Sequence, residues 1–335
     1  MCNMTKQSIL LVNLGTPDSA TPAGVKAFLR PFLSDTRVVN IPRLFWLPLL
    51  NGVILPLRCK RVAKAYQSIW FDDGSPLLHY SLLQQKALSA LFKGKGQGKG
   101  QGTGQDVQVE LAMTYGERSI KNAIAKLQQA GAEHIVVLPL FPQYSSTTTA
   151  PVFDQVANYL QSTIDVPSVS LVKHYHNNAA YIEALALSVE RHWAEKGRAE
   201  KLLLSYHGIP KFLVEKGDIY ADHCVETTAL LCARLGLTED QVVHCYQSRF
   251  GKAEWLQPYT NETLVKLAKS GTKSLDVIAP AFAVDCLETL EEMAIENKEV
   301  FVEAGGEDYR FIACLNDDEA HVRALHAVAS EYLRR

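Results

Sequence analysis

The sequence predicts an α/β protein with two similar domains, each built on a parallel sheet that helices cover on both faces. Three observations support this class. Short, continuous apolar runs recur along the chain, a turn and a helical pattern follow most of them, and four runs fall in each half. Buried parallel strands have this continuous apolar character because neither of their faces meets water. A chain of 335 residues is also long for one core and suits two domains.

The apolar runs define eight expected strands. In the first half they are Ile9 to Val12, Val107 to Met113, Ile135 to Phe141 and Ser168 to Val172. In the second half they are Leu202 to Tyr206, Val242 to Tyr246, Leu275 to Ile278 and Arg310 to Cys314. We expect one domain over residues 6–150 plus about 305–335, where the final helix after Asp318 returns to cover the first sheet, and a second domain over 151–304. No close sequence repeat is visible, so the duplication is inferred from architecture alone.

Composition excludes several functional classes. A hydrophobic content of 47% and a charged content of 21% describe a globular protein in water. The net charge of −2 offers no basic surface for a polyanion, so we expect no nucleic-acid partner. Seven cysteines and a polar start over Met1 to Ser8 favour reduced thiols in the cytoplasm. The sequence does not give the oligomeric state.

Two unusual segments interrupt this pattern. Leu44 to Leu57 is apolar but shorter than the ~20 residues that a membrane span needs, and it contains Pro48 and Pro56. We interpret it as an apolar flap or surface lip, with docking on a membrane surface as the alternative. Lys93 to Gln105 repeats Lys, Gly and Gln and is typical of a surface loop. No strand leads into it and no helix opens from it, which argues against a phosphate-binding loop.

Ligands of such sheets bind outside the carboxyl ends of the strands, so the residues that follow each run are the candidates for a site. These segments are residues 13–17, 114–116, 142–147, 205–208, 247–249 and 280–288. They contain hydroxyl groups, a histidine and the start of an acidic series. They lack the glycine pattern of a dinucleotide site and the loop of a nucleotide triphosphatase.

His207 follows an apolar strand directly, and Gly208 and Pro210 turn the chain away from it. An imidazole at this position can accept a proton near neutral pH or bind a divalent metal. The structural alternative is a histidine hydrogen-bonded to a neighbouring loop, and this is the commoner case for a single histidine at a strand end.

An acidic series follows the last apolar run but one. Glu288, Glu292 and Glu296 are spaced four apart, and Asp285 precedes them. Like charges at this spacing destabilise a helix by a few tenths of a kcal/mol per pair. Crowded carboxyl groups also resist ionising together, which raises some of their pKa values unless a cation is present. Carboxylate oxygens and an imidazole nitrogen suit a divalent metal, whereas a solvated acidic helix face is the alternative.

Other residues give weaker signals. Cys224, Cys232 and Cys245 lack the spacing of a zinc or iron–sulfur site. Cys286 lies beside the acidic series and could influence metal passage, or it could be an inert buried thiol. Trp255 lies in a segment that we expect to be mostly loop, where it either packs structurally or shapes a cleft for a planar ligand.

Taken together, these strand-end segments resemble those of ferrochelatases, which insert ferrous iron into a porphyrin at the end of haem synthesis. The matching segments are Leu11 to Pro17, Pro142 to Ser145, Ser205 to Pro210, Gln247 to Gly251 and Asp285 to Leu290. The resemblance implies two Rossmann-like domains of the chelatase type, with the porphyrin in a cleft between them. It also places Leu44 to Leu57 in the lip over that cleft.

The resemblance assigns a role to each matching residue. His207 corresponds to the active-site histidine and Glu288 to the glutamate that faces it. Glu292 and Glu296 match further acidic positions along a locally widened helix, and all four residues are candidates for contact with the metal. The expected substrate-binding residues are Leu14, Tyr115, Ser145, Arg249 and Trp255. Leu14, in place of the tyrosine of many Gram-positive relatives, favours protoporphyrin IX over coproporphyrin.

This chain departs from the animal members of the family. Ser146 stands where one ligand of their two-iron two-sulfur cluster would be, and residues Glu331 to Arg335 carry no cysteine. We therefore expect no cluster and no obligatory cofactor, with Fe²⁺ as a substrate. Cys286 stands where those relatives have a histidine.

The expected function is insertion of Fe²⁺ into protoporphyrin IX to form protohaem, by an enzyme in the cytoplasm with peripheral contact to the inner membrane as an open alternative. A chelatase for coproporphyrin or sirohydrochlorin is one rival interpretation. A porphyrin or haem carrier without catalytic activity is another, although a carrier would need no acidic series.

Overall fold

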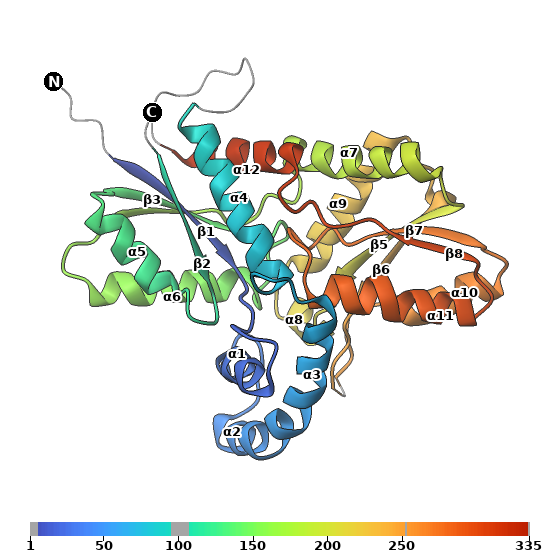
Figure 1. Ribbon diagram of the computed structural model, residues 1–335, viewed down its shortest axis with the longest axis horizontal. Helices are drawn as coiled ribbons and strands as arrows, with labels where there is room; N and C mark the ends of the chain where they lie inside the picture. Colours follow the sequence, from blue (N-terminus) through green and yellow to red (C-terminus); the bar gives the residue numbers. More distant parts are fainter. Residues whose placement is uncertain (1–5, 95–106, 252, 334–335) are drawn as a thin grey trace. The chain divides into compact units, whose positions relative to one another are not determined.

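The computed structural model describes residues 6–94, 107–251 and 253–333. Most of the expected Lys93 to Gln105 loop and the first five residues therefore lie outside the described part. The chain divides into two compact units, shown in Figure 1. Unit 1 comprises Met1–Phe141, Ser146–His174 and Leu325–Arg335, and unit 2 comprises Pro142–Ser145 and Tyr175–Ala324.

Unit 1 is built on a sheet of four parallel strands. They are β1 (Gln7–Asn13), β2 (Gln108–Met113), β3 (His134–Pro139) and β4 (Ser168–Leu171), in the order β2-β1-β3-β4. Every residue of β1 and of β3 is buried, as the continuous apolar runs predicted. Leu11 of β1 pairs with Leu111 on one side and with Leu138 on the other, which sets the register of the central strands.

Helices cover both faces of this sheet. On one face, α5 (Ile120–Gln129) and α6 (Thr149–Ser162) pack residues such as Ile124 and Val152 against β1 and β3. In addition, α4 (Pro76–Phe92) packs along β2, and the ring of Phe92 packs against His326 of α12 (Glu319–Tyr332). The helix α1 (Pro22–Ser34) follows the end of β1, and the hydroxyl of its N-cap residue Thr21 accepts a hydrogen bond from the backbone N–H of Gly24.

The apolar segment Leu44 to Leu57 is helical, and its prolines do not interrupt it. It runs through α2 (Arg43–Leu49), a π-helix (Leu50–Ile54) and the start of α3 (Leu55–Ile69). Pro56 lies just after the π-helix, and the backbone stays helical through Ile54 and Leu55, with φ of −67° and −62°.

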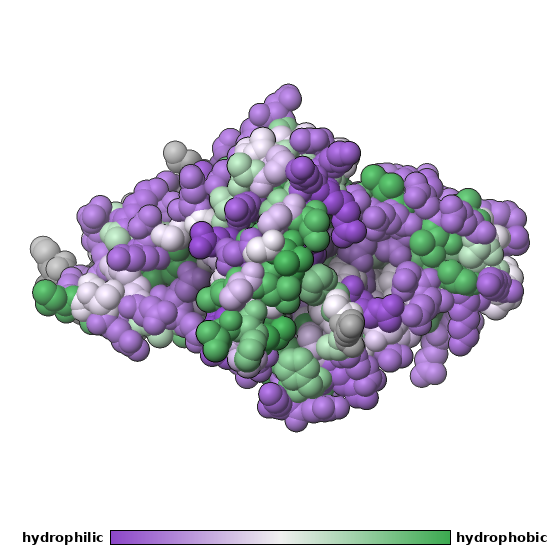
Figure 2. Space-filling model, turned by 90° about the horizontal axis from the view of Figure 1, so that it is seen from below, coloured by the Kyte–Doolittle hydropathy of each residue, from purple (hydrophilic) through white to green (hydrophobic). Residues whose placement is uncertain are grey.

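This segment lies on the surface of unit 1. Leu44, Phe45 and Leu57 are 81%, 71% and 74% exposed, while Trp46 and Leu50 anchor the segment inside. Figure 2 shows hydrophobic surface gathered over this part of the unit. The segment is thus an exposed apolar surface, as the sequence predicted. Among the residues that the structure describes, no helix has both the length and the hydropathy to cross a bilayer.

Unit 2 repeats the same sheet. Its parallel strands are β5 (Lys201–His207), β6 (Val242–Gln247), β7 (Ser274–Ile278) and β8 (Asp308–Phe311), in the order β6-β5-β7-β8. Its remaining helical elements are α7 (Ala179–Lys196), α8 (Lys211–Glu215), α9 (Tyr220–Leu235), a 3₁₀ turn (Glu239–Gln241), α10 (Thr260–Lys269), a π-helix (Glu288–Glu296) and α11 (Asn297–Glu303). The two sheets therefore have the same strand order, which supports the duplication inferred from the sequence.

The two faces of the second sheet are stabilised differently. On one face, Met293 of the π-helix and Phe301 of α11 pack against Leu275 and Val277 of β7. On the other face, buried Asp276 accepts hydrogen bonds from His192, Trp193 and Arg310 at 2.8–3.0 Å. Every donor to this carboxylate comes from the same unit, so its buried charge is compensated locally.

All eight predicted strands are present, and the prediction of two parallel-sheet domains is confirmed. The expected domain boundaries at residues 150 and 304 differ from the division seen in the structure. β4 pairs with β3, so residues up to His174 belong to unit 1. β8 pairs with β7, so unit 2 continues to Ala324, and only the later part of α12 joins unit 1.

Candidate active site

The topology of unit 2 brings the two main candidate residues to one place. The strand order is β6-β5-β7-β8. From β5 the chain goes to β6 on one side and then crosses to β7 on the other side of β5, so the switch point of the sheet lies between β5 and β7. Ligands of doubly wound sheets bind at such points. His207 is the last residue of β5, and the segment after β7 leads into the π-helix that begins at Glu288. The strand-end argument and the sheet topology therefore point to the same edge of the sheet.

A single hydrogen bond sets the tautomer of His207. Its Nδ1 lies 2.6 Å from the carbonyl oxygen of Gly208, which can only accept, so Nδ1 carries the hydrogen. Nε2 then holds the lone pair that can take a proton or bind a metal. The ring lies 6.3 Å from the rings of both Trp255 and Phe282, between centroids. His207 thus makes a hydrogen bond to a neighbouring loop, as a structural histidine would, while its Nε2 can still act as a base.

Gly208 lies in a closely packed position beside this histidine. A Cβ atom at this position would lie 3.0 Å from the carbonyl oxygen of Gln247 and 3.2 Å from the ring of Trp255. The backbone N–H of Gly208 also donates to Gln247 at 2.9 Å. The chain after β5 is therefore held close against the end of β6.

The glutamates stand on a widened helix, as the resemblance implied. Hydrogen bonds in the segment Glu288–Glu296 run from residue i to i+5, a rare pattern that is often found at functional sites. Glu292 interacts electrostatically with both His207 and Glu288, so the three side chains form one group. Burial raises the pKa of Glu292 above its ordinary value and Glu288 adds to the rise, while Ser248 and His207 act in the opposite direction. The neighbouring Glu288 thus raises the pKa of Glu292 as expected, although burial makes the larger contribution to the rise.

Glu296 and Asp285 lie at the two ends of this acidic series and differ in environment. Glu296 is exposed at the last position of the π-helix. Asp285 is buried and accepts from the backbone N–H of Cys314, the amide of Asn316 and the hydroxyl of Thr289, at 2.7–3.2 Å. Donors from its own unit thus bind both of its oxygens, and we interpret Asp285 as an anchor for the start of the π-helix.

Cys286 is buried beside these residues. Burial raises the pKa of its thiol well above the ordinary value, and the nearby Glu288 adds to that rise. A thiol in this environment stays protonated and binds metals poorly, since the thiolate is the ligand form. The inert alternative is the better description of Cys286.

The other expected substrate-binding residues of unit 2 have varied surroundings. Trp255 lies beside His207, and its indole Nε1–H is buried without a hydrogen-bond partner in the described part of the chain. The guanidinium of Arg249 lies 4.3 Å from the centre of the Tyr259 ring and 3.6 Å from a carboxylate oxygen of Glu262. Ser145 is buried and donates to Asp218 at 3.1 Å. Of these three, only Trp255 adjoins the histidine.

Leu14 and Tyr115 are neighbours at the strand ends of unit 1. The backbone N–H of Tyr115 donates to the carbonyl of Leu14 at 2.9 Å, and its hydroxyl donates to Asp35 at 2.8 Å. Gly15 is needed between them, because its φ is +115° and a Cβ would lie 2.0 Å from the Tyr115 carbonyl oxygen. Tyr115 borders a cavity of about 480 Å³ that is also lined by Phe28. The two residues therefore share one edge of the first sheet, as predicted.

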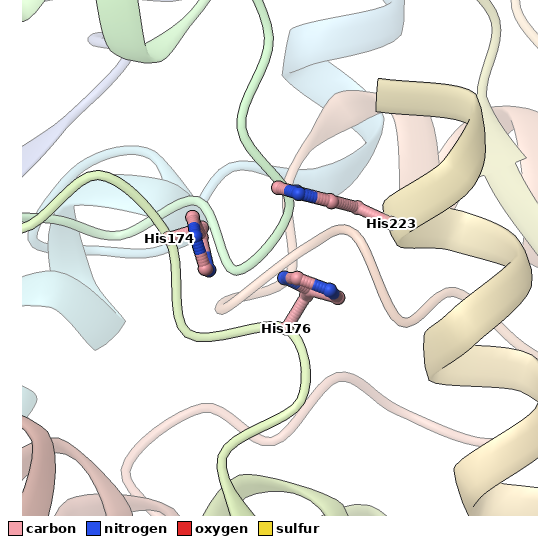
Figure 3. Close-up of side chains that lie close together, drawn as sticks. All are labelled: His174, His176 and His223. Carbon is pink, nitrogen blue, oxygen red and sulfur yellow. The ribbon is translucent and has the colours of Figure 1, made fainter. Parts of the chain in front are cut away.

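The structure also reveals a histidine pair that the sequence gave no reason to join. Figure 3 shows His176 and His223, whose rings stack at 3.6 Å between centroids with 10° between planes. His176 bonds to Glu226 at 2.7 Å, and His223 accepts from the backbone N–H of Tyr144 at 3.2 Å. A metal lies in the plane of each imidazole that binds it, and two parallel rings at this separation cannot share one such position. We therefore interpret the pair as structural.

Comparison with known proteins adds family information to this geometry. A model of the ferrochelatase family matches residues 6–333. The chain is 52% identical to a ferrochelatase of Aliivibrio fischeri (strain MJ11), over 98% of each chain. It is 53% identical to ferrochelatase 1 of Shewanella oneidensis, over 96% of this chain and 95% of the relative. Among solved structures, SirB from Bacillus subtilis with Fe³⁺ aligns over 98% of this chain and 95% of its own with a TM-score of 0.56. Its identity is 14%, so it supports the fold alone.

Proposed function

The chain belongs to the ferrochelatase family, and we propose that His207, Glu288 and Glu292 form the centre at which it inserts iron. The protein is a metal chelatase that inserts iron into a porphyrin for haem synthesis, as its similarity to ferrochelatases across nearly the whole chain supports. The rival interpretations, a chelatase for another tetrapyrrole or a carrier without catalytic activity, are not favoured.

The reaction needs groups that remove protons and groups that hold an ion. A free porphyrin carries two pyrrole N–H groups that point into the hole that the metal must enter. Bending the macrocycle exposes the nitrogen lone pairs, and strain of ~1–5 kcal/mol can be supplied by binding contacts remote from the reacting atoms. His207 accepts the pyrrole protons through Nε2. Glu288 and Glu292 hold the ion or pass protons onward, and Glu296 is the first carboxylate that an ion from solvent meets.

The observation that carries this proposal is the tautomer of His207 together with its acidic neighbours. The bond from Nδ1–H to Gly208 leaves the basic nitrogen on the opposite side of the ring. Glu292 lies within electrostatic reach of both His207 and Glu288. A general base of this kind contributes roughly 10²–10⁴-fold to the rate of a reaction that requires proton transfer.

Replacement of His207 tests the proposal directly. We expect His207→Ala to lower the rate of metal insertion at least roughly 10²-fold, because the base is lost, while porphyrin still binds. The measurement follows the absorption spectrum of protoporphyrin IX mixed with Zn²⁺ and the protein, with porphyrin binding followed by fluorescence. His326→Ala serves as the control, because this ring packs on Phe92 in unit 1. Unchanged insertion by His207→Ala would refute the assignment.

We further propose protoporphyrin IX as the porphyrin. Leu14 supports this, because an apolar side chain at the strand end suits a substrate that has apolar substituents where coproporphyrin carries extra carboxylates. Running the same insertion assay with coproporphyrin in parallel tests the choice. A higher kcat/KM for coproporphyrin would contradict it.

We propose that the enzyme works without an iron–sulfur cluster or another obligatory cofactor, with Fe²⁺ as a substrate only. In the described part of the chain, no group of three or more potential metal ligands includes a cysteine. The described cysteines other than Cys232 are buried. The purified protein should therefore insert metal without any absorption from a cluster.

We propose a cytoplasmic location with peripheral contact to the inner membrane through the apolar lip. Residues 36–71 contain six basic residues and no acidic residue, namely Arg37, Arg43, Arg58, Lys60, Arg61 and Lys64. The same segment exposes Leu44, Phe45 and Leu57. Apolar side chains flanked by cations suit the surface of an anionic membrane.

A further inference from the structure

The end of β6 is bonded to the π-helix at two points. The side-chain amide of Gln247 donates to the backbone carbonyl of Glu288 at 3.3 Å. Next to it, the backbone N–H of Ser248 donates to Oε1 of Glu292 at 2.8 Å, and the Ser248 hydroxyl donates to Oε2 of the same carboxylate. The strand end therefore contacts both glutamates of the candidate active site.

The backbone of Ser248 is unusual in a way that serves this contact. Its φ is +65°, in the left-handed region that residues other than glycine seldom adopt. In this conformation the N–H and the side chain of one residue point to the two oxygens of one carboxylate. Hydrogen bonds to an ionised acceptor are about twice as strong as bonds between neutral groups. Such a strained position is retained where the surrounding structure holds it, often at functional sites.

We propose that Ser248 is a positioning residue that fixes the carboxylate of Glu292 beside His207 and Glu288, ready to receive the metal ion before insertion. This inference rests on the proposed function. Each carboxylate oxygen has a second lone pair, so an ion can bind while Ser248 still donates to both oxygens. A glutamate side chain loses substantial rotamer freedom when it is ordered, and Ser248 supplies that order before the ion arrives.

A purely structural role for the contact makes different predictions. If Ser248 served only to stabilise the π-helix, its loss would lower the melting temperature and leave metal affinity unchanged in the folded protein. If it positions Glu292, its loss weakens metal binding by an amount that depends on the presence of that carboxylate. The interaction between the two residues is therefore the quantity to measure.

The experiment uses the full chain in four forms: unmodified, Ser248→Ala, Glu292→Gln and the double variant. Zn²⁺ alone is titrated calorimetrically into each form, and insertion of Zn²⁺ into protoporphyrin IX is then followed for KM and kcat. Ser270→Ala is the matched control, because its exposed hydroxyl bonds only within its own helix end, to Leu267. Ser248→Gly, which suits a φ of +65°, replaces the alanine variant if the latter does not fold.

We expect Ser248→Ala to weaken Zn²⁺ binding and raise the KM for Zn²⁺ by roughly tenfold, since a charged hydrogen bond is lost. The KM for porphyrin should change less than about twofold. In the Glu292→Gln background the same change should have little further effect. Equal effects of Ser248→Ala in both backgrounds, or no zinc binding by the unmodified protein, would overturn the inference. Zinc binding without insertion would instead count against the proposed function.

Discussion

At the scale of single residues, the structure gives side-chain geometry, such as hydrogen bonds and tautomers, that the sequence does not predict. The position of His207 after an apolar strand made it a candidate among the ten histidines of the chain, and the family resemblance assigned its role. Its tautomer depends on the carbonyl of Gly208, which no sequence pattern specifies. The hydrogen bonds from Ser248 to Glu292 depend on a positive φ at Ser248. A serine in the sequence does not predict that conformation.

Buried histidines give the protein a dependence of stability on pH. Burial lowers the pKa of His321 from 6.5 to about 4 in the folded protein, while its Nδ1 bonds to the carbonyl of Asn316. The unfolded chain therefore binds more protons than the folded chain between these two values. The contribution of His321 is fully present above pH 6.5 and is lost progressively as the pH falls towards 4, by up to about 3 kcal/mol.

We expect the free energy of unfolding in urea to decrease more steeply between pH 6.5 and 4.5 in the unmodified protein than in His321→Gln. The difference in slope should reach up to about 1.4 kcal/mol per pH unit, which is the limit for one titrating group. Urea melts at four pH values measure both slopes. Identical slopes would show that His321 does not titrate on unfolding in this range.

At the scale of elements, the π-helix is the feature that organises the site. Its first turn is fixed by Asp285, which accepts from Thr289 inside the element and from Cys314 and Asn316 beyond β8. The sequence showed the acidic spacing but could not separate Asp285, which is buried and structural, from the glutamates that follow it. Which carboxylate in a series of like charges becomes buried depends on tertiary contacts, and the spacing of acidic residues in the sequence does not predict these contacts.

Asp285→Ala should destabilise unit 2 and impair insertion together. Three donors lose their buried acceptor, and we expect a loss of about 3 kcal/mol or more in the free energy of unfolding. The insertion rate should fall even at temperatures where the variant stays folded, because the start of the π-helix is no longer held. Thermal melts and the zinc insertion assay measure both effects.

Asp317→Ala is the matched control, because that carboxylate is exposed in the same region. Its free energy of unfolding should change by less than about 0.5 kcal/mol. An Asp285→Ala variant with normal insertion kinetics would show that the start of the π-helix does not need this anchor.

The strands were predictable and the unit boundaries were not. Continuous apolar runs located central strands such as β1 and β3 because both of their faces are covered, whereas the edge strands β4 and β8 are only partly buried. The allocation of β4 to unit 1 depends on its pairing with β3, from His134↔Ser168 to Val137↔Leu171, which hydropathy does not encode. The short segment Pro142–Ser145 joins unit 2 through contacts such as Ser145 with Asp218, which are also invisible in the sequence.

At the scale of the whole molecule, chemistry and surface properties are distributed unequally. Unit 2 carries His207 and the glutamates, whereas unit 1 carries the apolar lip and the six basic residues that flank it in residues 36–71. Both units share one strand order, so the difference arises from the segments that follow the strands. Parallel sheets of this kind fix where ligands bind and leave the choice of chemistry to those segments.

The lip should bind anionic membranes in preference to neutral ones. Each cation near an anionic surface contributes about 1 kcal/mol, and exposed apolar side chains add to it. We expect the protein to sediment with vesicles of phosphatidylcholine and phosphatidylglycerol, less with phosphatidylcholine alone, and less at high salt. Phe45→Ser with Leu57→Ser should weaken binding to the mixed vesicles.

Ile164→Ser is the control for the vesicle experiment, because Ile164 is 103% exposed in unit 1 but lies outside the lip. It should bind like the unmodified protein. Equal binding of the lip variant and this control would exclude the lip as the membrane contact.

The i+5 hydrogen bonding of Glu288–Glu296 also limits how this gene segment can change in length. Loss of one codon inside it would let the helix rewind to ordinary α geometry and shorten the four-residue spacing of the glutamates, while the helix beyond it kept nearly the same facing. Glu292 or Glu296 would then leave the row that starts at Glu288. Point substitutions elsewhere on the same helix leave that alignment intact. We therefore expect deletions within Glu288–Glu296 to be tolerated far less often than substitutions.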